Sequence, residues 1–139
     1  MCRSACNCSC TRPPTSASDG SLSTTTGGYL LSSGAIEWFE GHYAPDRTDW
    51  RASPMLGSDH RGVAPASVLT CEFDPLRDEG DDYAAKLASA GVVVKHTCYP
   101  GLIHGAFSMG RVAPSARAMM DDAVAAISSA LGSAAPITE

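Results

Sequence analysis

Hydrophobic and polar positions along the chain predict a strand, a helix and a second strand in its middle. The nearly continuous apolar run at residues 66–73 predicts a strand that is covered on both faces. A β-branched run at residues 92–99 predicts the second strand. Between them, Tyr83 and Leu87 recur at helical spacing with alanines beside them, which predicts a core-facing helix. This order predicts a right-handed crossover that makes the two strands parallel neighbours.

The helix between these strands has a predicted start and a predicted end. Asp78 stands where an N-cap is expected, because its carboxylate can accept a hydrogen bond from the first turn. Acidic residues follow near the positive end of the helix dipole: Glu79, Asp81 and Asp82. Gly91 fits the position just after the helix. Asp78 has a second interpretation as a catalytic carboxylate, but its place ahead of the helix favours the cap. Arg77 is expected to form a local ion pair.

Two further helices are predicted outside this unit, on either side of it in the sequence. Ser32 or Ser33 can cap a helix that runs to about Tyr43. Its apolar stripe consists of Ile36, Phe39 and Tyr43. Turn chemistry predicts a loop at residues 44–64. The last helix begins at Pro114, and a stripe at helical spacing is expected to pack on the sheet: Met120, Val124, Ile127 and Leu131.

The two ends of the chain are predicted to stay outside the folded part. Residues 1–27 are rich in Ser, Thr and Cys with almost no large apolar side chains, so we expect a disordered leader. Residues 133–139 form a predicted flexible tail, which leaves a domain over residues 28–132. The leader contains four closely spaced cysteines: Cys2, Cys6, Cys8 and Cys10. Their alternating spacing differs from the C-x₂₋₄-C pairs of zinc sites, so no metal site is expected. Cys71 and Cys98 lie in the predicted strands and are expected to be core thiols.

Composition and charge narrow the classes of partner. The net charge of −5 and the scattered Lys and Arg residues argue against a nucleic-acid or anionic-membrane partner. No apolar run approaches the roughly 20 residues that span a bilayer, and the N-terminus lacks the apolar segment of a secretory signal. A cytoplasmic protein is therefore expected.

The candidate chemistry lies where the two predicted strands end. Asp74 follows the first strand, and Pro75 prevents further ladder pairing. His104 follows the second strand between Gly101 and Gly105, which allow a tight loop. Parallel strands bring their carboxyl ends to one edge of the sheet, where α/β proteins bind ligands. A carboxylate beside a histidine can orient the ring for removing a proton from a nucleophile. For the other three histidines we expect structural or solvated roles: His42, His60 and His96.

The run Asp-Pro-Leu-Arg-Asp-Glu-Gly at residues 74–80, followed by Gly-x-x-His-Gly at residues 101–105, resembles the hormone-sensitive lipase family of α/β-hydrolases. The resemblance covers roughly residues 28–131, and Arg51 to Pro54 resembles the family's Ser-Pro connection. It implies an α/β fold, namely the C-terminal part of an α/β-hydrolase, with two parallel strands, flanking helices and an incomplete sheet. It also implies a carboxylic ester hydrolase that acts on small-molecule esters without a metal or organic cofactor, with Asp74 and His104 as triad members.

The resemblance leaves two features of this chain open. In the family, the segment around Trp38 and Phe39 helps to form the substrate side, so these rings either contact an acyl group or, as we favour, simply pack. The sequence contains neither the G-x-S-x-G elbow that carries the nucleophilic serine nor an HGGG-type oxyanion loop. The chain is therefore either the Asp- and His-bearing part of an ester hydrolase or a non-catalytic fragment. A fragment of this kind would leave a sheet edge open for self-association, and resemblance implies a homodimer through the strand at residues 92–99.

Overall fold

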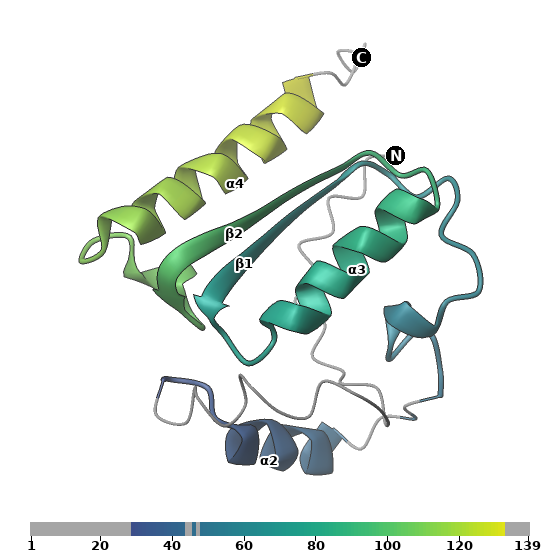
Figure 1. Cartoon of the computed structure of the whole chain (residues 1–139), viewed down its shortest axis with the longest axis horizontal. Helices are drawn as coiled ribbons and strands as arrows, with labels where there is room; N and C mark the ends of the chain where they lie inside the picture. Colours follow the sequence, from purple (N-terminus) through teal and green to yellow (C-terminus); the bar gives the residue numbers. More distant parts are fainter. Residues whose placement is uncertain (1–28, 44–45, 47, 133–139) are drawn as a thin grey trace, which may run out of the picture.

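The computed structural model describes residues 29–43, 46 and 48–132, and the predictions for the cysteine-rich leader and the tail lie outside them. Within this part the elements follow in the order α2 (Ser33–Tyr43), η1 (Pro54–Leu56), β1 (Ala66–Phe73), α3 (Arg77–Ser89), β2 (Val94–Ile103), η2 (Ala106–Met109) and α4 (Pro114–Gly132). Strands β1 and β2 pair in parallel and form the sheet of the described part. Helices α3 and α4 pack on its two faces (Figure 1). The predicted crossover and the predicted α/β class with an incomplete sheet are confirmed.

The main core lies between the sheet and α4. Successive residues of β1 point to opposite faces, so that Cys71 meets Met119 of α4, while Thr70 lies against Gly80 of α3. The buried cluster on the α4 face is Cys71, Tyr99, Leu102, Ala106, Ala116 and Met119. On the other face, α3 buries Ala84 and Leu87, which confirms the core-facing side of this helix.

The prediction that Asp78 caps α3 is wrong, because the helix begins at Arg77 and its N-cap position is Leu76, two residues before Asp78. The turn before it is closed by Asp74, whose Oδ1 accepts the backbone N–H of Leu76 at 2.9 Å. The backbone carbonyl of Asp74 accepts the N–H of Arg77 at 3.0 Å. Asp78 therefore lies inside the first turn, where its carboxylate binds the Arg77 guanidinium at 2.7 Å, as the expected local pairing of Arg77 requires.

Helix α3 ends at Ser89, Gly91 takes its predicted place just after the helix, and this ending shifts the start of β2. The N–H of Gly91 binds the carbonyl of Ala88 at 2.9 Å, and the N–H of Val92 binds that of Leu87 at 3.1 Å. These two bonds form a Schellman motif. Val92 is thus engaged with the helix end, so β2 begins at Val94 and continues to Ile103. The predicted range of residues 92–99 was wrong at both ends.

Three predictions of burial are also wrong. Helix α4 turns Ala116, Met119 and Ala123 to the core. Of the expected stripe, Met120 is half-buried, whereas Val124, Ile127 and Leu131 are exposed. In α2, whose bounds agree with the prediction, the stripe residues Phe39 and Tyr43 are exposed. Cys98 is exposed as well, because α3 packs mainly on β1 and leaves this face of β2 partly open, whereas Cys71 is buried as predicted.

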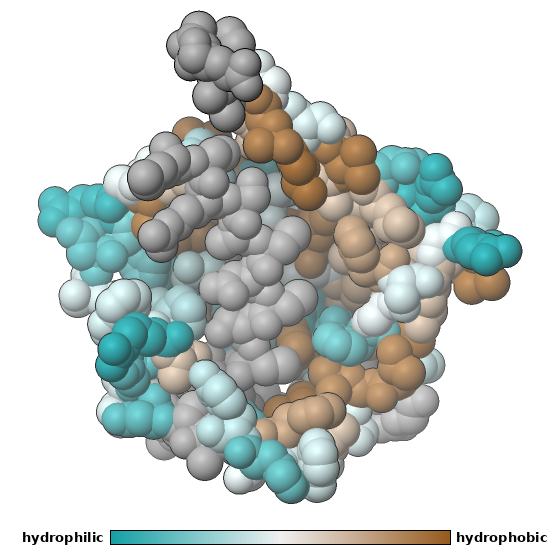
Figure 2. Space-filling model, turned by 180° about the vertical axis from the view of Figure 1, so that it is seen from behind, coloured by the Kyte–Doolittle hydropathy of each residue, from teal (hydrophilic) through white to brown (hydrophobic). Residues whose placement is uncertain are grey.

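Many of the exposed side chains are large and apolar. Figure 2 shows hydrophobic residues gathered along one side of the face that is turned away in Figure 1. Those exposed on α4 and just before it are Val112, Val124, Ile127 and Leu131. Among the described residues, no helix has the length and apolar character that crossing a membrane requires.

Candidate active site

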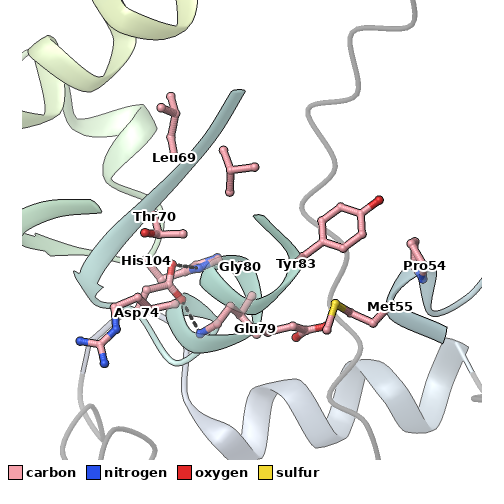
Figure 3. Close-up of a pocket in the computed structure, with 12 residues that line it drawn as sticks. Pro54, Met55, Leu69, Thr70, Asp74, Glu79, Gly80, Tyr83 and His104 are labelled. Carbon is pink, nitrogen blue, oxygen red and sulfur yellow. Dashed lines mark hydrogen bonds and ion pairs between the residues drawn. The ribbon is translucent and has the colours of Figure 1, made fainter. Parts of the chain in front are cut away.

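Asp74 and His104 lie side by side at the carboxyl ends of the two strands. The Nδ1 atom of His104 is 2.9 Å from Oδ2 of Asp74 (Figure 3). The other carboxylate oxygen, Oδ1, accepts the N–H of Leu76, so both oxygens of Asp74 have a donor. Only 14% of the Asp74 side chain is exposed, against 30% of the His104 ring. The structure therefore places these two residues together, with the carboxylate shielded and the imidazole open to a further group.

The loop after β2 fixes the direction of the His104 side chain. Gly105 has a φ of +75° and caps the short helix η2, which follows at once. The Gly105 carbonyl accepts both the backbone N–H and the hydroxyl of Ser108, at 3.0 and 2.8 Å. A Cβ at position 105 would lie 2.6 Å from Cδ2 of Leu30, and the positive φ is itself unfavourable for side-chain-bearing residues. Glycine is thus required at the residue that follows the histidine.

The arrangement selects one tautomer of the His104 ring. A carboxylate can only accept, so Nδ1 must carry the proton that points to Asp74. Nε2 then presents a lone pair and can accept a proton from a group that approaches the exposed side of the ring. In nucleophilic triads, an Asp holds the histidine in this same state.

A cavity of about 110 Å³ adjoins this pair. Asp74 and His104 lie at one part of its lining, and Met55 and Tyr83 lie at another (Figure 3). Its walls come from β1, from the N-terminal half of α3 and from η1. The catalytic candidates therefore border a largely apolar hollow instead of projecting into open solvent.

Two residues that the sequence analysis did not assign to the site hold η1 against α3. His60 is 8% exposed, and its Nε2 is 3.0 Å from the carbonyl oxygen of Pro54. The His60 ring also packs edge-on against Tyr83, with 6.0 Å between ring centroids. Lys86 donates from Nζ to the carbonyl of Met55. The expected structural role of His60 is thus found, but its partners lie 6 and 23 residues away, beyond the reach of local patterns.

The remaining two histidines have structural contacts as well. His96 of β2 lies 2.9 Å from Oδ1 of Asp81 on α3 and 3.3 Å from the hydroxyl of Thr70 on β1. It therefore ties the helix to both strands. In α2, Nδ1 of His42 is 2.8 Å from the carbonyl of Trp38, four residues earlier in the same helix.

The other candidate residues are not part of the cavity. Asp78 is engaged by Arg77, and this hydrogen bond raises the pKa of the Arg77 guanidinium above its ordinary value. Trp38 and Phe39 contact each other with 5.1 Å between ring centroids, and they are 58% and 60% exposed. The core packing that we favour for these rings is therefore wrong, and the acyl contact stays a prediction. No group of three or more His, Cys, Asp or Glu residues within the described ranges is arranged to hold a metal ion.

Sequence comparison places this geometry in a known family. A family described as having the alpha/beta hydrolase fold matches residues 7–108. The chain belongs to this family. Among curated relatives, it is 42% identical over 107 residues to an ethyl acetate hydrolase from Pseudomonas putida, a match that covers 75% of this chain and 31% of that protein. It is 34% identical over 127 residues to the carboxylesterase NlhH from Mycobacterium tuberculosis, covering 85% of this chain and 40% of the relative.

Solved structures agree with this assignment. The ester hydrolase EH1AB1 from the Lake Arreo metagenome, solved with a bipyridine phosphonate derivative, matches with a TM-score of 0.72 and 36% identity, over 87% of this chain and 40% of that one. The thermostable carboxylesterase EstE1, cloned from a metagenomic library, matches with a TM-score of 0.74 and 30% identity, over 86% and 42%. The chain thus spans between 31% and 42% of the length of these relatives, and it corresponds to part of an α/β-hydrolase domain.

Proposed function

We propose that this chain supplies the acid and the base of a Ser-His-Asp site in a carboxylic ester hydrolase. The observation that carries the proposal is the 2.9 Å contact between His104 Nδ1 and Asp74 Oδ2 at the shared edge of two parallel strands. In this role Nε2 of His104 takes the proton of a serine hydroxyl as that oxygen attacks the ester carbonyl, and later gives it to the leaving alcohol. Asp74 holds the ring and stabilises the imidazolium that forms.

The burial of the two groups supports this division of roles. A carboxylate that orients a histidine works best when it is shielded from water and already hydrogen-bonded, as Asp74 is by Leu76. A general base must be accessible to the group whose proton it removes, and the partial exposure of the His104 ring supports this role. The neighbouring cavity gives the ring an apolar border on one side.

The nucleophile and the oxyanion donors are not encoded in this sequence, which contains neither a G-x-S-x-G nor an HGGG-type motif. In our proposal they come from a polypeptide segment that pairs beside β1. The substrate is a small carboxylic ester, and the mechanism asks for no metal or organic cofactor. We further propose residues 28–132 as the unit that carries the function, and the cytoplasm as its location.

A first experiment measures the chain by itself. We expect no hydrolysis of an activated short-chain ester, such as p-nitrophenyl acetate, above the rate of the His104→Ala variant, because no activated serine is present. Clear activity of the wild-type chain that the His104→Ala change abolishes would show that a nucleophile is present after all.

A chimaera tests the roles of the two residues directly. Residues 28–132 replace the matching segment in the ethyl acetate hydrolase of Pseudomonas putida, which supplies the rest of its own domain. We expect an active esterase whose kcat falls by about 10³-fold or more on His104→Ala or Asp74→Asn, as for other triads. His96→Ala is the matched control, because His96 also contacts an Asp at 2.9 Å but lies near the start of β2, away from the carboxyl ends of the strands.

A loss of activity must be distinguished from a loss of folding. Circular dichroism and thermal unfolding show whether each chimaera is folded. We expect the His96→Ala chimaera to retain most of its activity. A folded chimaera that hydrolyses the ester equally well with and without His104 would overturn the proposal.

A second candidate function is self-association without catalysis. Within the described part, β2 pairs with β1 alone, and large apolar side chains are exposed on α4. The outer edge of β2, including residues 94–99 of the predicted dimer strand, is therefore available to a second copy of the chain. Sedimentation velocity over a range of concentrations tests this. A dimer that Cys98→Pro disrupts would favour the module, because the N–H of residue 98 lies on the edge of β2 that faces away from β1. A monomer at all concentrations would exclude it.

A further inference from the structure

The pairing register of β1 and β2 changes just before the catalytic pair, and this change sets which residue faces Asp74. From Ala66, which pairs with Val94, to Cys71, which pairs with Tyr99, each partner lies 28 residues further along the chain. At Phe73 the partner is Ile103, 30 residues further along. Between these pairs, three residues of β2 at positions 100–102 stand opposite a single residue of β1, Glu72.

This bulge has a direct consequence for the site. If the register of the earlier pairs continued, Leu102 would stand opposite Asp74. The two additional residues move the chain forward so that His104 reaches that place and contacts the carboxylate at 2.9 Å. Bulges commonly re-aim side chains next to functional sites. The Asp74–His104 contact therefore depends on the bulge being held.

The side chain of Glu72 occupies the position from which the bulge can be held. Oε2 of Glu72 accepts the backbone N–H of Gly101 at 2.7 Å. Gly101 has a φ of +72°, so the chain turns here and the N–H points away from the regular ladder. Pro100, just before it, has no N–H to satisfy. The carboxylate thus provides the acceptor for a bulge amide that β1 would otherwise leave without a strand partner.

The backbone of Glu72 is itself fixed. Nη1 of Arg77 donates to the Glu72 carbonyl at 3.2 Å, while the rest of the guanidinium binds Asp78. Glu72 therefore connects the start of α3 to the loop that leads into His104. Hydrogen bonds from a backbone N–H to a carboxylate are shorter and stronger than those to a neutral acceptor, which agrees with the 2.7 Å distance.

We propose that Glu72 is a positioning residue that holds the Pro100–Gly101 bulge and so sets His104 opposite Asp74. This inference rests on the proposed function for its catalytic meaning, but the contact itself can be tested without catalysis. Glu72 acts on His104 through Gly101, and its loss is expected to loosen the Asp74–His104 contact while the sheet and helices persist.

Nuclear magnetic resonance of the full chain provides the test. The ¹⁵N shifts of the His104 ring report which nitrogen carries the proton, and they are read well above the ordinary histidine pKa of about 6.5. We expect the Nδ1-protonated tautomer to dominate in the wild type. Glu72→Ala is expected to lose this preference, whereas Glu72→Gln, which retains an acceptor oxygen, is expected to keep most of it. Asp82→Ala, which removes an exposed carboxylate of α3, is the control and is expected to change nothing.

Two further measurements separate the possible failures. Asp74→Asn must also remove the preference: if it does while Glu72→Ala does not, the positioning role is wrong and the Asp–His pair stands. If neither changes the ring shifts, the pair itself fails, and the proposed function with it. Should Glu72→Ala not fold, the Gly101 amide proton of the wild type decides, because it must move upfield when acid protonates Glu72. An amide resonance that does not respond would overturn the proposal.

Discussion

Gly80 of α3 lies directly against Thr70 of β1, and this contact sets the closest approach of the helix to the sheet. A Cβ built at Gly80 would be 2.8 Å from Cγ2 of Thr70. The Thr70 side chain has little freedom to move away, since its hydroxyl donates to Asp81 at 3.0 Å and its β-branched χ1 is stiff. Glycine at position 80 thus allows α3 to deliver Arg77 and Asp81 to their partners.

The Gly80→Ala variant is expected to be less stable despite the better helix propensity of alanine. Alanine gains about 0.5–1 kcal/mol in a helix interior, but overpacking costs about 1–3 kcal/mol. Urea unfolding measures the difference. Adding Thr70→Ser, which removes Cγ2 and keeps the hydroxyl, is expected to restore most of the loss. Gly41→Ala in α2, where nothing lies within 4 Å of the new Cβ, should instead be stabilising; a destabilised Gly41→Ala together with a neutral Gly80→Ala would contradict this account.

At Gly105, which follows His104, the effect of backbone strain can be measured separately from the effect of side-chain contact. We expect Gly105→Ala to lose about 1–2 kcal/mol from the left-handed conformation alone. The new Cβ would also press on Cδ2 of Leu30. The double variant with Leu30→Ala should recover only the contact part in urea unfolding. The His104 ring shifts are expected to stay perturbed in both variants, and full recovery in the double variant would show that φ at position 105 is unimportant.

The sequence was sufficient for elements whose signal is local. The strand at residues 66–73 was predicted to the residue, because an apolar run ended by Asp-Pro has few other interpretations. The parallel pairing follows from the order of the elements along the chain, and it predicts that Asp74 and His104 lie at one edge of the sheet. The start of α3 was missed because Asp78 has the sequence pattern of an N-cap, whereas Asp74 closes the turn before the helix by accepting the N–H of Leu76.

The contacts that the sequence did not reveal depend on register and approach distance. The predicted strand ends at residue 99 and Gly101 is predicted to belong to a tight loop, although β2 continues through Pro100 and Gly101 as a bulge. That interpretation left Glu72 as an ordinary strand residue, and no spacing rule connects it to Gly101, 29 positions later. Likewise, hydrophobicity alone predicts that the larger side chains form the buried face of α4. The helix instead packs on the sheet through the face that carries Ala116 and Ala123, because these small side chains let the helix approach more closely.

The choice of face in α4 gives a direct prediction. Met119 is 7% exposed and contacts the Cys71 thiol, whereas Val124 is 59% exposed. Met119→Ala is expected to cost about 2–5 kcal/mol of unfolding free energy, as for other buried methionines. Val124→Ala is expected to change it by no more than about 0.5 kcal/mol. Equal effects in thermal and urea unfolding would show that the helix buries both faces in solution.

Tyr99, in the middle of β2, links this strand to α4 and makes the free energy of unfolding depend on pH at alkaline values. Its hydroxyl donates to Oδ2 of Asp122, and burial, followed by this hydrogen bond and the Asp122 charge, raises the pKa of Tyr99 to about 12. In the unfolded chain a tyrosine titrates near 10. Between these values the folded chain retains a proton that the unfolded chain releases, so the free energy of unfolding falls as pH rises.

This contribution is fully present below about pH 10 and is lost as the pH passes through the folded pKa near 12. Urea unfolding at intervals from pH 9 upward, compared between the wild type and Tyr99→Phe, isolates it from the titration of lysines, which both chains share. We expect the wild type to lose stability more steeply with pH than Tyr99→Phe. Tyr43→Phe is the control, because Tyr43 is 72% exposed, and it should retain the wild-type slope. Absorbance at alkaline pH reports tyrosine ionisation independently, and one tyrosine must ionise at higher pH than the exposed ones. Equal slopes of stability against pH in the wild type and Tyr99→Phe, together with a single tyrosine titration, would contradict a buried Tyr99 hydroxyl.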